Sequence, residues 1–172
     1  MQPITTINSR DIFDGKNNIL PDPPIIVADM LRTPENIGSL IRMAANIGIV
    51  RVVCIENEKV QMRESKIRRT ACMAWDYVEL IHATAENYTE FIPSDYQLVA
   101  LETSSISKNI FQTQLPRKMA LVVGNEIHGV RMELLEQCPQ HVNIPMTGPA
   151  TSMNVSHATC VALFEWVRQY AI

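Results

Sequence analysis

The 172-residue chain lacks any run of apolar residues long enough to cross a membrane. Its first six residues also lack the basic region and apolar core of a secretory signal. We therefore expect a cytoplasmic protein that makes no contact with a membrane. Its length and its hydrophobic content of 47% fit one domain with a well-filled core.

Closely spaced cysteines are absent as well. The four cysteines, Cys54, Cys72, Cys138 and Cys160, are widely separated and form no Cys-x-x-Cys motif. None has a histidine or a second cysteine at the spacing of zinc ligands, and the four histidines are scattered. We therefore expect reduced thiols, most of them buried, and no metal site.

Common nucleotide-binding and catalytic motifs are missing too. No Gly-x-Gly-x-x-Gly follows an apolar run, which argues against a standard dinucleotide-binding fold. Gly124 and Gly129 have the spacing of a P-loop, but the Lys-Ser/Thr pair that should follow them is absent. No local signature of a Ser-His-Asp set is present. A nucleotide-like cofactor would therefore bind by another route.

Positive charge is not in excess, because the formal net charge is −3. Nucleic-acid-binding proteins are usually basic, so this balance counts against that class. The cations are nevertheless concentrated, since residues 59–69 carry five cations and one anion. Arg63, Lys66, Arg68 and Arg69 of this segment could face a phosphate backbone. A solvated helix face is the alternative.

Apolar runs of strand length alternate with helical patterns along the chain. Several runs are continuously apolar and rich in Val and Ile, as strands buried on both faces are. The six runs are residues 25–30, 50–55, 77–81, 97–101, 119–123 and 141–144. The alternation predicts an α/β fold, with a mostly parallel sheet and helices on both faces. Residues 1–24 are polar and turn-rich, so we expect an N-terminal extension followed by one domain over residues 25–172.

Two helices have recognisable ends. Thr33-Pro-Glu offers an N-cap, a proline at the first helical position and an acid in the first turn, and Gly48 stands where a C-terminal cap belongs. The last helix, predicted from about Asn154 to Tyr170, is apolar over most of its circumference. Its large apolar side chains include Val155, Val161, Phe164 and Trp166. Such a helix must be covered on more than one side, either in the core or at a subunit interface.

Three segments combine glycines with polar residues beside the predicted strand ends. Residues 36–42 open the first helix and include Gly38, which is unfavourable inside a helix and indicates close approach of another backbone. Residues 124–129 follow a buried strand, and Glu126 lies where parallel sheets bind ligands. Residues 143–158 lead through a Pro/Gly/Ser/Thr loop into the last helix. Each segment taken alone also has an ordinary explanation. The first is compatible with a capping Asn and an exposed Arg, the second with a tight turn, and the third with an ordinary β–α connection.

Together the three segments resemble the three motifs of the SpoU family of RNA ribose methyltransferases, in the SPOUT class. Asn36-x-Gly38-x-x-x-Arg42 resembles the first motif, and Gly124-x-Glu126-x-x-Gly129 resembles the second. The third is matched by Ile144-Pro-Met146 with Gly148 and by Ser152-Met-Asn154-Val-Ser156. The resemblance covers about residues 25–170. It departs at Met153, where the family often has Leu, a swap that conserves volume.

The resemblance implies a parallel α/β sheet whose C-terminal part forms a trefoil knot, S-adenosylmethionine as the cofactor, and a homodimer. The implied reaction is methyl transfer to a ribose 2′-hydroxyl of RNA. We expect no appended RNA-binding domain, as in the compact members, many of which act on tRNA, so tRNA is favoured over rRNA. A non-catalytic RNA-binding relative with the same fold is an alternative. An ordinary α/β domain whose loops match by chance is another.

The resemblance also assigns residues to roles. The catalytic group would be Asn36, Arg42, Glu126, Ser152 and Asn154. The cofactor would lie against Leu101, Glu102, Thr103, Gly124, Asn125, Ile144, Pro145, Met146, Ser152 and Met153. From the charge pattern, we expect Arg63, Lys66, Arg68 and Arg69 to hold the RNA, because they belong to the densest cluster of cations. The family likeness suggests that this segment borders the active site.

One of these roles has a chemical restriction. The family likeness puts Arg42 of one subunit near the cofactor of the other. A guanidinium normally stays protonated, so we expect Arg42 to hold a phosphate or to stabilise the forming alkoxide, rather than to act as a base.

Overall fold

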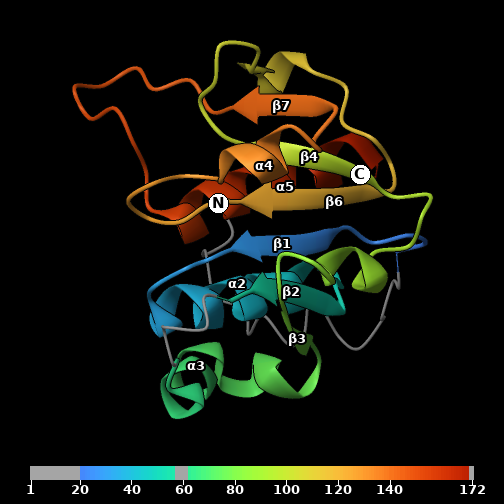
Figure 1. The fold of residues 1–172 in the computed structure, drawn as a ribbon, viewed down its shortest axis with the longest axis vertical. Coiled ribbons are helices and arrows are strands. Elements are labelled where there is room, and N and C mark those ends of the chain that lie inside the picture. Colours follow the sequence, from blue (N-terminus) through green and yellow to red (C-terminus); the bar gives the residue numbers. More distant parts are fainter. Residues whose placement is uncertain (1–19, 57–61, 171–172) are drawn as a thin grey trace, which may run out of the picture.

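The computed structural model describes residues 20–56 and 62–170, in which seven strands form one parallel sheet (Figure 1). The strand order is β3-β2-β1-β6-β4-β7-β5. The strands are β1 (Ile25–Asp29), β2 (Arg51–Ile55), β3 (Glu79–Ala83), β4 (Gln97–Leu101), β5 (Lys108–Asn109), β6 (Met119–Val123) and β7 (Gln140–Asn143). From β1 the chain continues to β2 and then to β3, at one edge of the sheet. The later strands lie on the opposite side of β1. The order therefore reverses between β1 and β6, where open α/β sheets form ligand crevices.

Helices cover both faces of the sheet, as the sequence predicts. The helices are α2 (Pro34–Ile47), α3 (Glu64–Ala71), α4 (Met132–Leu135) and α5 (Val155–Tyr170), with 3-10 turns η1 (Cys72–Asp76), η2 (Tyr88–Phe91) and η3 (Ile110–Gln112). Successive side chains of a strand point to opposite faces of the sheet. On β1, Ile26 faces a core that it shares with α2, α3 and α5. Val27 faces the other core, which includes residues of η2 and α4. The predicted α/β architecture is confirmed, while a trefoil knot in the C-terminal part stays a prediction.

The predicted strands are all present, with shifts of one or two residues at their ends. The third strand begins at Glu79 instead of residue 77, because Tyr77 closes the preceding 3-10 turn. The two-residue strand β5 was not expected, since Lys108 and Asn109 form no apolar pattern. Elements of this length leave no periodic signal in a sequence.

The first helix shows why its glycines are needed. Gly48 ends α2 with a φ of 78°, in the left-handed region that favours glycine. A side chain at Gly38 would place its Cβ 2.6 Å from the carbonyl oxygen of Ile67 and from the Cβ of Thr70. The close approach predicted for Gly38 is therefore confirmed, and the backbone that approaches it belongs to α3.

The last helix packs part of its apolar surface into the core of its own chain. Trp166 is 1% exposed, and its Nε1 donates hydrogen bonds to the carbonyl oxygens of Pro116 and Arg117. Trp166 is therefore covered by the core of its own chain, which is one of the two kinds of cover expected for this helix. Phe164 is 51% exposed, so the apolar side chains of α5 still do not all enter one core.

Other expectations concern single residues and classes of site. Cys54 and Cys138 are buried, Cys160 is half-buried and Cys72 is exposed, and all four are free thiols. Over the described residues, no helix combines the length and apolarity of a membrane span, and no three His, Cys, Asp or Glu side chains gather as metal ligands. Of the expected N-terminal extension, residues 1–19 lie outside the described residues.

Candidate active site

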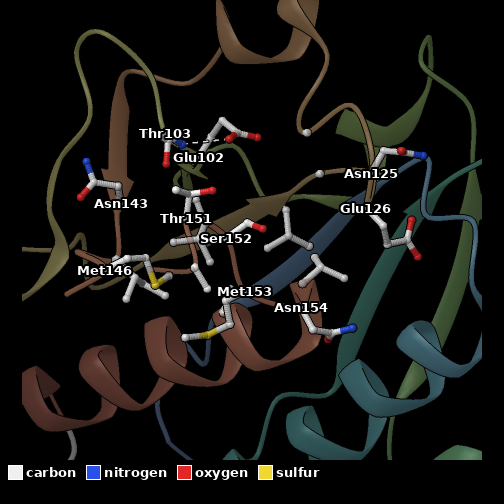
Figure 2. A pocket seen from close by; sticks show the side chains of 18 of the residues that line it. Glu102, Thr103, Asn125, Glu126, Asn143, Met146, Thr151, Ser152, Met153 and Asn154 are labelled. Carbon is white, nitrogen blue, oxygen red and sulfur yellow. Dashed lines mark hydrogen bonds between the residues drawn. The ribbon is translucent and has the colours of Figure 1, made fainter. Parts of the chain in front are cut away.

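A cavity of about 860 Å³ opens at the carboxyl ends of β4, β6 and β7 (Figure 2). Leu101 pairs with Val123 on one side and with Val142 on the other, so these strands end at the same level. The walls come from the loops after β4 and β6 and from the long connection between β7 and α5. All ten residues predicted to bind the cofactor line this cavity: Leu101, Glu102, Thr103, Gly124, Asn125, Ile144, Pro145, Met146, Ser152 and Met153.

The lining combines apolar side chains with negative charge. Apolar side chains include Ile144, Met146 and Met153, and the two charged side chains are those of Glu102 and Glu126. None of the described residues that line the cavity is a lysine or an arginine. The cavity therefore suits a ligand that has an apolar part and carries a positive charge.

The loop after β6 is held in shape by its own backbone. Asn125 and Gly129 exchange two backbone hydrogen bonds, of 3.0 and 2.9 Å, and Gly129 has a φ of 70°. A Cβ at Gly124 would overlap the backbone of Gly129 and Val130. Glycine at position 124 is therefore required by the loop itself, before any ligand is considered.

Hydrogen bonds to the end of β1 hold the loop after β6 in place. The carboxylate of Asp29 is fully buried and accepts hydrogen bonds from the backbone N–H and the Nε of Arg131, each at 2.9 Å. The Nη2 of Arg131 lies 2.8 Å from the same carboxylate. The side chain of Asn125 donates to the carbonyl oxygen of Met30 at 2.6 Å. Sequence reasoning missed the ion pair, although an acid at the end of a buried strand is a signal for one.

Glu102 connects the loop after β4 to the loop after β6. Its carboxylate accepts hydrogen bonds from the backbone N–H groups of Thr103 and Val130, both at 2.9 Å. A side chain at Gly129 would collide with that carboxylate. Glu102 thus lines the cavity, as predicted, and also fixes two of its walls.

Glu126 caps the first helix from a distant part of the chain. Its carboxylate accepts hydrogen bonds from the backbone N–H groups of Arg32 (2.9 Å) and Thr33 (3.0 Å) and from Nδ2 of Asn36 (2.8 Å). Thr33 occupies the N-cap position, but its own side chain makes no capping hydrogen bond. Burial acts to raise the pKa of Glu126, but these hydrogen bonds outweigh it and lower the pKa below its ordinary value. Glu126 is therefore an ionised acceptor at neutral pH.

Asn36 joins the third motif to the other two. Its Oδ1 accepts a hydrogen bond of 3.1 Å from Nδ2 of Asn154. The Oδ1 of Asn154 in turn accepts from the backbone N–H of Ser156 at 2.9 Å, which caps α5. Glu126 and Asn154 lie on the same side of the cavity in Figure 2, opposite Met146. One chain of hydrogen bonds therefore connects all three sequence motifs.

The remaining two predicted catalytic residues are placed differently. Ser152 lines the cavity and is exposed, and it makes no hydrogen bond with another described residue. Arg42 is exposed on α2 and is not among the residues that line the cavity. The structure therefore brings together Asn36, Glu126, Ser152 and Asn154, and leaves Arg42 apart from them within one chain.

The cationic segment includes most of α3, and its residues 59–61, with Lys59, lie outside the described residues. Lys66 lies 3.6 Å from the carboxylate of Glu35, which brings the first turns of α3 and α2 together. Arg68 pairs with Glu64 at 2.7 Å and also lies over the ring of Trp75, at 4.6 Å.

The other two cations of the segment, Arg63 and Arg69, differ from Lys66 and Arg68. Arg63 and Arg69 are exposed and form no ion pair with the described residues. Of the four predicted RNA-binding cations, Lys66 and Arg68 are therefore engaged with acidic side chains. Arg63 and Arg69 are available, in the sense that they form no ion pair with the described residues.

Comparison with known proteins gives matches over nearly the whole chain. The 23S rRNA (guanosine-2'-O-)-methyltransferase RlmB of Pasteurella multocida is 34% identical over 171 residues, covering 98% of this chain and 69% of the relative. Its counterpart in Haemophilus influenzae is 35% identical over 174 residues, with the same two coverages.

Solved structures match the fold. The SpoU methyltransferase AviRb of Streptomyces viridochromogenes has a TM-score of 0.77 at 22% identity, covering 89% of this chain and 62% of its own. A protein solved in a study of 2-OH methylation of C/U34 on tRNA has a TM-score of 0.75 at 26% identity, covering 87% of this chain and 97% of its own.

The chain thus spans about two thirds of the length of the rRNA methyltransferases that it resembles. Residues 23–164 match the SpoU rRNA Methylase family, in agreement with the resemblance found in the three motifs. This match, together with the two relatives above 30% identity, shows that the chain belongs to the SpoU rRNA methylase family.

Proposed function

We propose that the chain transfers a methyl group from S-adenosylmethionine to a ribose 2′-hydroxyl of ribosomal RNA. The observation that carries this proposal is the junction of Asn36, Glu126 and Asn154, which joins the three motifs at the edge of one cavity. The choice of rRNA rests on the two relatives named 23S rRNA (guanosine-2'-O-)-methyltransferase, which match 98% of the chain. The tRNA preference predicted from the sequence gains no support from them.

Transfer RNA is the second candidate substrate, and one specific observation favours it. The protein from the study of C/U34 methylation on tRNA is covered over 97% of its length, whereas the rRNA methyltransferases are covered over 69%. Nearly the whole fold of the tRNA-related protein is therefore matched by this chain.

The cavity fits the proposed cofactor by its chemistry. S-adenosylmethionine supplies a methyl group on a positively charged sulfonium, attached to a flat adenine and an amino-acid tail. The apolar side chains of Ile144, Met146 and Met153 can pack against the adenine. The carboxylates of Glu102 and Glu126 give the lining the opposite charge to the sulfonium. The exposed hydroxyl of Ser152 is an available donor or acceptor within the same lining.

The residues at the edge of the cavity have distinct proposed roles. Glu126 already accepts three hydrogen bonds and is ionised, so its role is to fix the first turn of α2 and not to take a proton from the ribose. Asn36 and Asn154 hold the helix ends together as positioning residues. When bound, the cofactor would supply the methyl group and leave as the neutral thioether, and the proton of the 2′-hydroxyl would pass to solvent water. Arg42 would stabilise the negative charge that develops on the 2′-oxygen before it takes the methyl group, or would hold the adjacent phosphate.

A homodimer would bring Arg42 to a cavity. Arg42 is exposed and does not line the cavity of its own chain. The apolar side chain of Phe164, on α5, is 51% exposed to water. We propose that a second copy covers α5 and receives Arg42 beside its cofactor. Two inactive variants, each defective in one half of the site, should then restore activity when they are mixed.

Helix α3 and its N-cap residue, Arg63, supply the proposed RNA-binding surface. Arg63 and Arg69 are exposed, and Lys66 lies next to the first turn of α2 through its contact with Glu35. The pairing of Arg68 with Glu64 reduces its share in this surface. Because the first turn of α2 also carries Asn36, a phosphate backbone along α3 would run toward the cavity.

Mapping 2′-O-methyl groups in a deletion strain tests the choice of substrate. The proposal expects the loss of one 2′-O-methyl group from 23S rRNA, with the tRNA modifications unchanged. Loss from tRNA alone would favour the second candidate. Unchanged RNA of both kinds would support a non-catalytic RNA-binding relative.

A further inference from the structure

The cavity has no cation of its own to hold a polyanionic substrate. Among the described residues, its lining contains two carboxylates and no lysine or arginine. A ribose that approaches this cavity carries a phosphate on each side, and phosphates next to carboxylates repel them unless a cation lies between. The cations that permit binding must therefore lie outside the lining, and the rim is one place for them beside α3 and the Arg42 of a second subunit.

Two segments form the rim beside Glu126, namely residues 29–36 and 124–131, and together they contain two arginines. Arg131 is engaged, because its guanidinium forms an ion pair with the fully buried Asp29. Arg32 is exposed and takes part in no ion pair with the described residues. Arg32 is therefore the available arginine of this rim.

The backbone of Arg32 is fixed relative to the cavity. Its N–H donates a hydrogen bond of 2.9 Å to Oε2 of Glu126, a residue of the cavity lining. The next residue, Thr33, donates to Oε1 of the same carboxylate, at 3.0 Å. Glu126 thus anchors the main chain of Arg32 while the side chain extends into solvent. A guanidinium on a fixed backbone binds an anion with less loss of conformational freedom than one on a mobile loop.

We propose that Arg32 binds a phosphate of the RNA beside the nucleotide that is methylated. This inference rests on the proposed function and adds a substrate-binding residue to it. The planar guanidinium can donate two parallel hydrogen bonds to a phosphate, which fixes orientation as well as supplying charge. Because Glu126 holds Arg32 and α2 together, the same contact sets the position of the phosphate relative to Asn36.

Charge-neutral variants test this role. Arg32→Gln is compared with Arg117→Gln, a matched control whose exposed arginine precedes β6 at the opposite end of the strands from the cavity. The measurements are RNA affinity over a range of salt concentrations, S-adenosylmethionine affinity, and kcat and KM for RNA. Arg32→Gln should weaken RNA binding several-fold, raise KM for RNA and reduce the salt slope by about one unit. Cofactor affinity should stay at the parent value, and Arg32→Lys should recover most of the salt slope.

Two results would overturn the inference. One is RNA affinity and a salt slope in Arg32→Gln equal to those of Arg117→Gln. The other is weaker S-adenosylmethionine binding in Arg32→Gln, which would assign the guanidinium to the carboxylate of the cofactor. RNA binding and methylation by the parent chain distinguish a failure of the proposed function from a failure of the inference. If the parent neither binds nor methylates RNA, the proposed function fails and the inference falls with it; if the parent methylates RNA and Arg32→Gln does so equally well, only the inference fails.

Discussion

Nδ2 of Asn36 donates a hydrogen bond of 2.8 Å to the carboxylate of Glu126, which lies 90 positions further along the chain. The other side of the same amide accepts from Asn154, at the start of α5. Two helix N-termini and the loop after β6 are therefore fixed to one another through a single buried side chain. The polar edge of the cavity depends on that side chain, although Asn36 does not line the cavity itself.

Replacing Asn36 tests this dependence. Asn36→Ala removes one of three donors from Glu126 and the acceptor of Asn154. We expect the free energy of unfolding to fall by about 1–3 kcal/mol and methyl transfer to fall strongly, with little change in cofactor affinity. Ser39→Ala on the same helix is the control, because within the described part of the chain the Ser39 hydroxyl donates only to the carbonyl oxygen of Glu35. Equal stability of the two variants in urea would contradict the role of Asn36.

The acid dependence of stability should report on Glu126. Burial opposes its ionisation, but hydrogen bonds from Arg32, Asn36 and Thr33 bring its folded pKa below the ordinary 4.5. The folded chain then binds fewer protons than the unfolded chain in this range. Stability from Glu126 is fully present above pH 4.5 and is lost as the pH falls through the folded pKa. Glu126→Gln should therefore lose stability less steeply than the parent below pH 4.5; parallel curves would show that the carboxylate contributes nothing.

Two of the three glycines that line the cavity, Gly124 and Gly148, should respond differently to a methyl group. Gly124→Ala forces a Cβ into the backbone of Gly129 and Val130, whereas a Cβ at Gly148 meets no atom within 4 Å. We expect Gly124→Ala to lose about 1–3 kcal/mol of stability and to bind S-adenosylmethionine at least about tenfold more weakly. Gly148→Ala should behave like the parent in both measurements. Calorimetry that finds parent affinity in a folded Gly124→Ala variant would show that the loop after β6 does not shape the cofactor site.

The surface of α3 offers a comparison between available and engaged cations. Arg63→Gln/Arg69→Gln removes two exposed arginines, whereas Arg68→Gln removes one that already pairs with Glu64. The double variant should weaken binding to every RNA sequence and lower the salt slope by about two units, one per phosphate contact. Arg68→Gln should have a much smaller effect. RNA binding by the double variant that matches the parent at physiological salt would make α3 an ordinary solvated helix.

Arg42 should affect the reaction and not the cofactor. Arg42→Ala is expected to abolish methyl transfer and to leave S-adenosylmethionine affinity close to that of the parent, because Arg42 lies outside the cavity lining. Arg42→Lys should also fail, since a point charge cannot replace a planar guanidinium. Near-normal turnover of Arg42→Lys would mean that only the charge at this position matters.

The parallel sheet and the position of the cavity could be predicted because they depend on local patterns. Buried parallel strands are continuous apolar runs, and their carboxyl ends lie at one edge of the sheet. The glycine at position 38 indicated a close backbone, and the structure shows that backbone to be α3. The assignment of site residues needed the resemblance as well, since each motif alone has an ordinary structural explanation.

The contacts that fix the site could not be predicted from the sequence. The ion pair between Asp29 and Arg131 joins residues 102 positions apart, and the bond from Val130 to Glu102 joins two loops on different strands. Such pairs depend on strand order, and β6 lies between β1 and β4 without being next to either in sequence. The sequence also left open which apolar side chains of α5 enter the core. Trp166 does so, and the carbonyl oxygens that accept its N–H come from the segment before β6.

Methyl transfer to RNA with a labelled cofactor tests the central claim most directly. Parent chain and Asn36→Ala are incubated with S-adenosylmethionine carrying a labelled methyl group and with rRNA from a strain that lacks the protein. The RNA is then digested to nucleosides. The account predicts label in a single 2′-O-methylnucleoside with the parent chain and little or none with Asn36→Ala. Label in a base-methylated nucleoside, or equal incorporation by the two proteins, would contradict it.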